Sequence, residues 1–287
     1  MSWSSGLRQL IAADEAGPAI PVQLYYPTAT DSVPVLFGPY VLDVSADAPA
    51  VAGRFPLLVI SHGGGGSPLL YRTLSTYLAR RGCVVACPRH PGNSLGDNDL
   101  AETDPTLINR PRHIRRVLDA MYADPALGGY LSPQVAVIGH SMGGYTALAV
   151  AGGVPWTRAG QRLEVMTDER VRALVLMAPA AAFFAPAGSL TAVRVPILLL
   201  EAEHDAVTPA WQADLVQQGV ADPRQVTRRT IPNAGHFSFL APFPPQMRNP
   251  GFAPALDPEG FDREAFHHWL PAQILAWLQA QLAPAGA

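Results

Sequence analysis

Short apolar segments that end in glycine or proline alternate with segments of helical spacing along most of this chain. Seven segments have the pattern of strands, and most are apolar on both faces: 22–28, 55–66, 82–92, 134–141, 171–179, 195–205 and 226–236. The last is more polar, as an edge strand would be. Five segments between them are predicted to be helices: 67–82, 110–124, 142–153, 209–220 and 262–282. This alternation predicts an α/β fold with a mostly parallel central sheet flanked by helices.

Length and composition narrow the class of protein. The chain has 287 residues, 48% of them hydrophobic and 15% charged, which is typical of a globular protein with a large core. Neither an internal repeat nor a long linker interrupts it, so we expect a single domain over 1–287. A net charge of −3 gives no reason to expect nucleic acid or an anionic membrane as a partner.

The N-terminal residues and the two cysteines indicate in which cellular compartment the protein is expected. The first residues have neither the basic nor the apolar region of a signal peptide, and no run of about 18 apolar residues predicts a transmembrane segment. Cys83 and Cys87 are four positions apart in a predicted strand, so their Cα atoms would be about 13 Å apart. A disulfide needs less than about 7 Å. We therefore expect free thiols and a cytoplasmic protein.

The segment 139–143 reads Gly-His-Ser-Met-Gly, with a predicted strand before it and a predicted helix after it. This is the G-x-S-x-G pattern of a nucleophile on a sharp strand-to-helix turn, where small neighbours let strand and helix pass closely. The simpler alternative is a tight glycine-rich turn without catalytic chemistry. The context favours Ser141 as a nucleophile.

A serine nucleophile needs a base, and the base needs an acid that orients it. In this fold the order along the chain is serine, acid, histidine. His236 follows the last predicted strand and is the candidate base, while Asp205 ends the preceding strand and is the candidate acid. Glu203, on the same strand face, is the alternative acid. The remaining downstream histidines, at 204, 267 and 268, fit surface or packing positions better.

An oxyanion would require two hydrogen-bond donors. We expect the backbone N–H of Met142, directly after the serine, and that of Gly64 in the glycine run 63–66. The same glycines do not fit a dinucleotide-binding turn, because Pro68 stands where G-x-G-x-x-G needs its last glycine. No cofactor is expected. A metal hydrolase is not favoured either, since ligand spacings such as H-x-x-x-H are missing.

With these residues in place, the chain resembles the serine α/β-hydrolases. Within them it is most similar to the predicted dienelactone-hydrolase group related to platelet-activating-factor acetylhydrolases, and more distantly to cutinase-type polyester hydrolases. The resemblance rests on 59–94, 110–121, 139–153, 233–240 and 261–270, and it implies a carboxylic-ester hydrolase. Those hydrolases carry a large apolar residue where this chain has Gly64, and true dienelactone hydrolases use a cysteine where it has Ser141.

The segments beside the expected site bear on the substrate. Residues 180–194, where such folds usually insert a cap, are too few for a helical one, so we expect an open site. The proline-rich segment 241–260 is expected to fold over one side of it. The candidates for a substrate-binding surface are aromatic: Phe183, Phe184, Phe237 and Phe243.

The predicted function is thus hydrolysis of an accessible small-molecule ester by Ser141, His236 and Asp205. Two alternatives use the same fold. One is another reaction of the same triad, such as thioester hydrolysis or perhydrolysis. The other is a binding module without catalysis, which an unreactive Ser141 would indicate.

Overall fold

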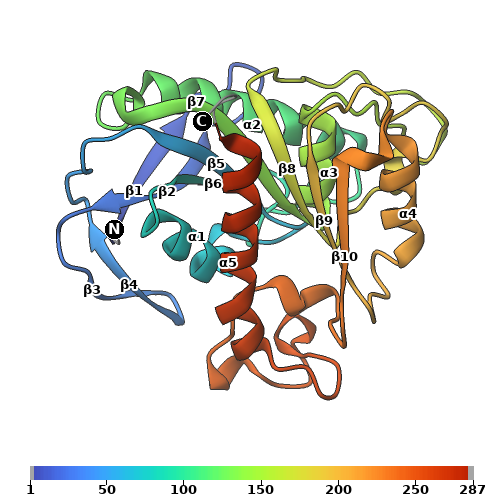
Figure 1. Cartoon of the computed structure of the whole chain (residues 1–287). Coiled ribbons are helices and arrows are strands. Elements are labelled where there is room, and N and C mark those ends of the chain that lie inside the picture. Colours follow the sequence, from blue (N-terminus) through green and yellow to red (C-terminus); the bar gives the residue numbers. More distant parts are fainter. Residues whose placement is uncertain (1–2, 284–287) are drawn as a thin grey trace.

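The computed structural model describes residues 3–283, and its centre is a ten-stranded sheet in the order β10-β9-β8-β7-β5-β6-β2-β1-β4-β3 (Figure 1). The strands are β1 (Ser4–Ala12), β2 (Ile20–Thr28), β3 (Val33–Phe37), β4 (Tyr40–Ala46), β5 (Phe55–Ser61), β6 (Val84–Pro88), β7 (Leu131–His140), β8 (Val171–Met177), β9 (Ile197–Ala202) and β10 (Val226–Ile231). Strands β6, β5, β7, β8, β9 and β10 pair in parallel. The mostly parallel sheet is therefore confirmed, with β10 at one edge.

The N-terminal strands extend the sheet in a way that the sequence pattern did not predict. β2 pairs antiparallel with β6, and β1 pairs antiparallel with β2. β4 then adds in parallel to β1 and forms a hairpin with β3. Only β2 was expected among these four, because β1, β3 and β4 lack the continuous buried run of the central strands, and no position of β3 is buried.

Within residues 3–283, five α-helices cover the two faces of the sheet: α1 (Arg72–Ala79), α2 (Asp104–Ala123), α3 (Met142–Val150), α4 (Ala210–Gly219) and α5 (Arg263–Leu282). Side chains of α2, α3 and α4 join one hydrophobic core, and those of α1 and α5 join the other. All five predicted helices are present. α2 begins six residues earlier than predicted and keeps Pro111 in its interior.

Both cysteines are free and buried, as the spacing predicted. Burial raises the pKa of the Cys83 and Cys87 thiols to about 12, which keeps them in the unreactive thiol form. Among residues 3–283, none of the helices combines the length and the apolar character that crossing a bilayer requires.

The parallel core of the sheet should dominate the stability of the fold. Leu57 lies on β5 in the middle of the sheet and is 0% exposed, whereas Leu36 on β3 is 71% exposed. We predict that Leu57→Ala lowers the free energy of unfolding by about 2 to 5 kcal/mol, since it leaves a cavity. Leu36→Ala should change it by less than about 0.5 kcal/mol. Urea denaturation measures both, and equal losses would contradict this assignment of the core.

Candidate active site

Ser141 lies in a strained turn between β7 and α3. Its φ and ψ are 54° and −119°, in the region of positive φ that residues other than glycine rarely adopt. The Ser141 N–H donates to the carbonyl of Met177 at 3.1 Å, and its carbonyl accepts from Ala180 N–H at 2.9 Å. The end of β8 thus holds the strained residue in place from both sides.

The glycines on either side of Ser141 are required by close backbone contacts. A Cβ atom on Gly143 would lie 1.8 Å from the carbonyl oxygen of Ser61, and one on Gly139 would lie 2.1 Å from the carbonyl of Gly143. No side chain fits such gaps. The G-x-S-x-G spacing therefore reflects the packing of α3 against the ends of β5 and β7.

The backbone N–H groups of Met142 and Gly64 have no acceptor within the described part of the chain. Met142 is the first residue of α3, where an N–H has no partner inside the helix. A Cβ on Gly64 would lie 3.5 Å from the Met142 side chain. Gly63 is nearer to Ser141, but its N–H already donates to the Tyr71 hydroxyl at 3.3 Å. This favours Gly64 over Gly63 as the second donor.

Asp205 and His236 are hydrogen-bonded to each other, at 2.8 Å between Oδ2 and Nδ1. The second carboxylate oxygen accepts the backbone N–H groups of Val207 and Thr208, and the Thr208 hydroxyl lies 2.8 Å from Oδ2. Burial by itself raises the pKa of the Asp205 carboxyl, but the bonds from His236 and Thr208 outweigh it and hold the pKa below its usual value. An ionised carboxylate only accepts, so Nδ1 of His236 carries hydrogen, and in the neutral ring Nε2 has a free lone pair.

His140 connects the loop of His236 to the turn of Ser141. Its Nε2–H donates to the carbonyl of His236 at 2.9 Å, and its Nδ1 accepts from the Tyr71 hydroxyl at 2.9 Å. Burial lowers the pKa of His140 to about 3, so the ring is neutral and keeps this tautomer. Because Tyr71 also bonds Gly63, one chain of contacts joins His236, the serine turn and the glycine loop. Neither His140 nor Tyr71 was predicted to have a role.

The other downstream candidates lie outside this group. Glu203 is exposed and accepts the backbone N–H of Asn233 at 2.8 Å. His267 is buried and lies 3.0 Å from the carbonyl of Ser238, while His204 and His268 are exposed. The structure thus brings Asp205, rather than Glu203, to His236.

The four aromatic candidates fall into two pairs, and two of them need correction. Phe184 and Phe243 are 2% and 1% exposed and belong to the two hydrophobic cores, so neither presents its ring to a substrate. Burial of a large aromatic ring is especially favourable in free energy, which explains why Phe184 and Phe243 lie in the cores. Phe237 is half-buried, with its ring centre 5.2 Å from that of His236, and Phe183 is half-buried against Tyr145.

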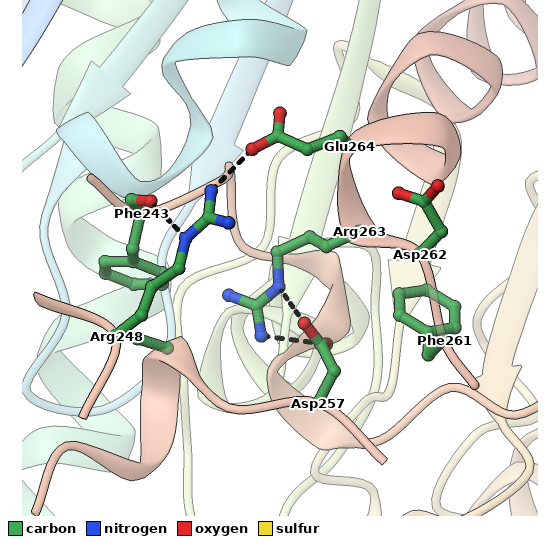
Figure 2. Close-up of a pocket in the computed structure, with 8 residues that line it drawn as sticks. Phe243, Arg248, Asp257, Phe261, Asp262, Arg263 and Glu264 are labelled. Carbon is green, nitrogen blue, oxygen red and sulfur yellow. Dashed lines mark hydrogen bonds and ion pairs between the residues drawn. The ribbon is translucent and has the colours of Figure 1, made fainter. Parts of the chain in front are cut away.

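Phe243 instead lines a cavity of about 280 Å³ between the segment 241–260 and the start of α5 (Figure 2). Four charged groups of this cavity are paired, Arg248 with Glu264 at 2.5 Å and Arg263 with Asp257 at 2.8 Å, and a fifth, Asp262, accepts the backbone N–H of Ala265 at 3.0 Å. Asp257 also accepts from the Ser238 hydroxyl at 2.7 Å, close to His236. Segment 241–260 therefore packs between α5 and the loop that carries His236.

Several buried histidines surround the site. Their pKa values are lowered by burial, to about 3 for His62 and about 4 for His113 and His267, with a lowered value for His90 as well. No group of three or more His, Cys, Asp and Glu side chains within residues 3–283 is arranged to hold a metal ion. These rings act as neutral hydrogen-bonding groups inside the protein.

Comparison with known proteins agrees with this architecture. The model of an alpha/beta hydrolase family matches residues 57–192, from β5 to just before β9. A ferulic acid esterase from Streptomyces cinnamoneus superposes with a TM-score of 0.74 at 21% identity, covering 97% of this chain and 89% of that one. A puromycin-hydrolyzing peptidase from Mycobacterium tuberculosis superposes with a TM-score of 0.63 at 16% identity, over 96% of this chain and 39% of that one. No curated protein matches the chain in sequence. The protein has the alpha/beta hydrolase fold.

The buried neutral histidines predict acid sensitivity. Their folded pKa values lie below the ordinary 6.5, so the unfolded chain binds more protons and stability is lost as the pH falls below about 6.5. Each histidine lowers the free energy of unfolding by at most about 1.4 kcal/mol for each pH unit below that value. Urea denaturation at pH 7, 6 and 5 should show a steadily falling free energy of unfolding. His267→Asn should make the free energy of unfolding less dependent on pH, by at most the uptake of one proton. His268→Asn, which removes an exposed ring, is the control. A flat profile would contradict the prediction.

Proposed function

We propose that this protein is a serine carboxylic-ester hydrolase that works through an acyl-enzyme. The observation that carries the proposal is the strained Ser141 beside two unoccupied backbone N–H groups, with the Asp205–His236 pair tied to the same turn through His140. A nucleophile, an oriented base and two oxyanion donors are the parts that acyl transfer requires.

Each part has a defined role in the proposed reaction. His236 Nε2 takes the proton of the Ser141 hydroxyl as Oγ bonds to the ester carbonyl carbon, and Asp205 stabilises the imidazolium. The N–H groups of Met142 and Gly64 bind the oxyanion of the tetrahedral intermediate. The carbon–oxygen bond to the alcohol breaks, and the alcohol leaves with the proton from His236. Water, deprotonated by His236, then releases the acid and restores Ser141.

The surroundings of Ser141 support an accessible ester of short to medium length as substrate. The segment 180–194 between β8 and β9 holds a 3₁₀ turn at Ala182–Phe184 and no α-helix, so it forms no helical cap. Ser141 and Met142 are both partly exposed. The ferulic acid esterase to which the fold is similar acts on an ester, which agrees with the proposal. The sequence motifs resemble those of the dienelactone-hydrolase and acetylhydrolase group, which supports the same reaction class.

The nucleophile can be tested directly. We predict that the wild-type protein hydrolyses p-nitrophenyl esters within the range from acetate to decanoate, and that Ser141→Ala lowers kcat/KM by about 10³-fold or more, because the attacking oxygen is lost. A fluorophosphonate probe should label wild-type Ser141. Labelling without ester turnover would point to a thioester or a peracid reaction of the same triad. The absence of both labelling and turnover would refute the proposal.

The assignment of the acid has a matched pair of variants two residues apart. Asp205→Asn should lower kcat by about 10³- to 10⁴-fold, since His236 then loses the acceptor that fixes its tautomer. Glu203→Gln should stay within a few-fold of wild type, because Glu203 bonds only the backbone of Asn233. Steady-state kinetics on the preferred p-nitrophenyl ester measures both. A larger loss in Glu203→Gln would reverse the assignment.

A further inference from the structure

Arg110 is a buried cation that is held by neutral groups alone. It lies inside α2 and is 1% exposed. Its guanidinium donates to Asn93 Oδ1 at 2.7 Å, to Thr146 Oγ1 at 2.9 Å, to Ser61 Oγ at 3.3 Å and to the carbonyl oxygen of His62. Within residues 3–283 no carboxylate forms an ion pair with it.

Such a group is costly for stability. A buried charge without a counter-ion loses its hydration and regains only hydrogen bonds, and an apolar side chain of similar volume would often be more favourable. Burial lowers the pKa of Arg110 to about 9, which leaves it charged at neutral pH. Arg112, on the same helix, instead has its carboxylate partner in Asp14 at 3.0 Å. The position of Arg110 therefore calls for an explanation beyond packing.

One acceptor of Arg110, the His62 carbonyl, lies just before the loop of Gly64, and its peptide carries the N–H of Gly63. The His62 carbonyl is held by the guanidinium, while His62 Nδ1–H and Gly66 N–H donate to the carbonyl of Gly63 at 2.7 and 3.1 Å. In a trans peptide the carbonyl and the following N–H point to opposite sides. Fixing the carbonyl of Gly63 therefore sets the direction of the Gly64 N–H.

A second acceptor, Thr146, contacts the first turn of α3. Thr146 accepts from Arg110 Nε, and its own hydroxyl donates to the carbonyl of Met142 at 2.8 Å. A third acceptor, Asn93, has its Nδ2 atom 3.9 Å from the Cβ position of Gly64. The guanidinium thus contacts the two segments that carry the unoccupied N–H groups, and it does so from inside the protein.

We propose that Arg110 is a positioning residue that holds the N–H groups of Gly64 and Met142 in register for an oxyanion, by joining the His62 carbonyl to Thr146. The inference rests on the proposed function, because it assigns the source of rigidity in the proposed oxyanion site. Only a planar group with several fixed donors can reach all four acceptors together. A misplaced donor weakens binding of the transition state more than binding of the ester.

The test compares Arg110→Met and Arg110→Lys with Arg112→Met as the control on the same helix. In the Arg110 variants kcat should fall about 10- to 100-fold with KM within about threefold, approaching the loss seen when one oxyanion donor is removed. Inhibition by an aryl trifluoromethyl ketone, whose hemiketal oxyanion occupies the same site, should weaken by a similar factor. Arg112→Met should lower the melting temperature and leave kcat within about twofold of wild type.

Folded Arg110 variants with unchanged kcat and unchanged inhibition would overturn the proposal. If Arg110→Met does not fold, Arg110→Lys and Thr146→Val, which each remove part of the contacts, decide by the same criteria. Amide hydrogen exchange of residues 61–66 provides a readout that is independent of turnover. If wild-type protein is inactive but exchange in this loop rises at least tenfold in Arg110→Lys, the proposed function fails and the positioning role survives. Unchanged exchange refutes the positioning role.

Discussion

The close contact between Gly143 and the end of β5 is the constraint on which the rest of the site depends. A Cβ on Gly143 would fall 1.8 Å from the Ser61 carbonyl oxygen, so helix α3 approaches the sheet as closely as bare backbone allows. That approach forces the chain through the positive φ of Ser141 and brings the N-terminus of α3 next to the glycine loop 63–66. The strained backbone of Ser141 is maintained because the packing on every side fixes its conformation.

The fold supplies the remaining groups from neighbouring strand ends. In a parallel sheet the carboxyl ends of the strands lie at one edge, and β7, β9 and β10 deliver Ser141, Asp205 and His236 to that edge. Buried polar contacts then fix the loops that follow the strands. Burying His140 on one side and Arg110 on the other costs desolvation free energy. Their hydrogen bonds, unlike apolar packing, are directional.

Much of the fold could be predicted because its central strands are buried on both faces. The continuous apolar runs of β5, β7, β8 and β9 are typical of central strands, and β7 and β9 end just before Ser141 and Asp205. β1, β3 and β4 were missed because half-exposed strands leave a weak pattern. The early start of α2 was missed because Pro111 is read as a boundary, whereas the packing of the helix tolerates it.

The sequence by itself determined the fold class, the serine turn and the order of Ser141, Asp205 and His236, since local backbone requirements and strand ends leave marks in neighbouring residues. Tertiary structure alone brought Asp205, rather than Glu203, against His236, and bonded the Gly63 N–H to Tyr71. It also buried Phe184, Phe243, His140 and Arg110. These arrangements depend on contacts between residues far apart in the chain. The local sequence pattern does not indicate which hydrogen bonds form at those contacts.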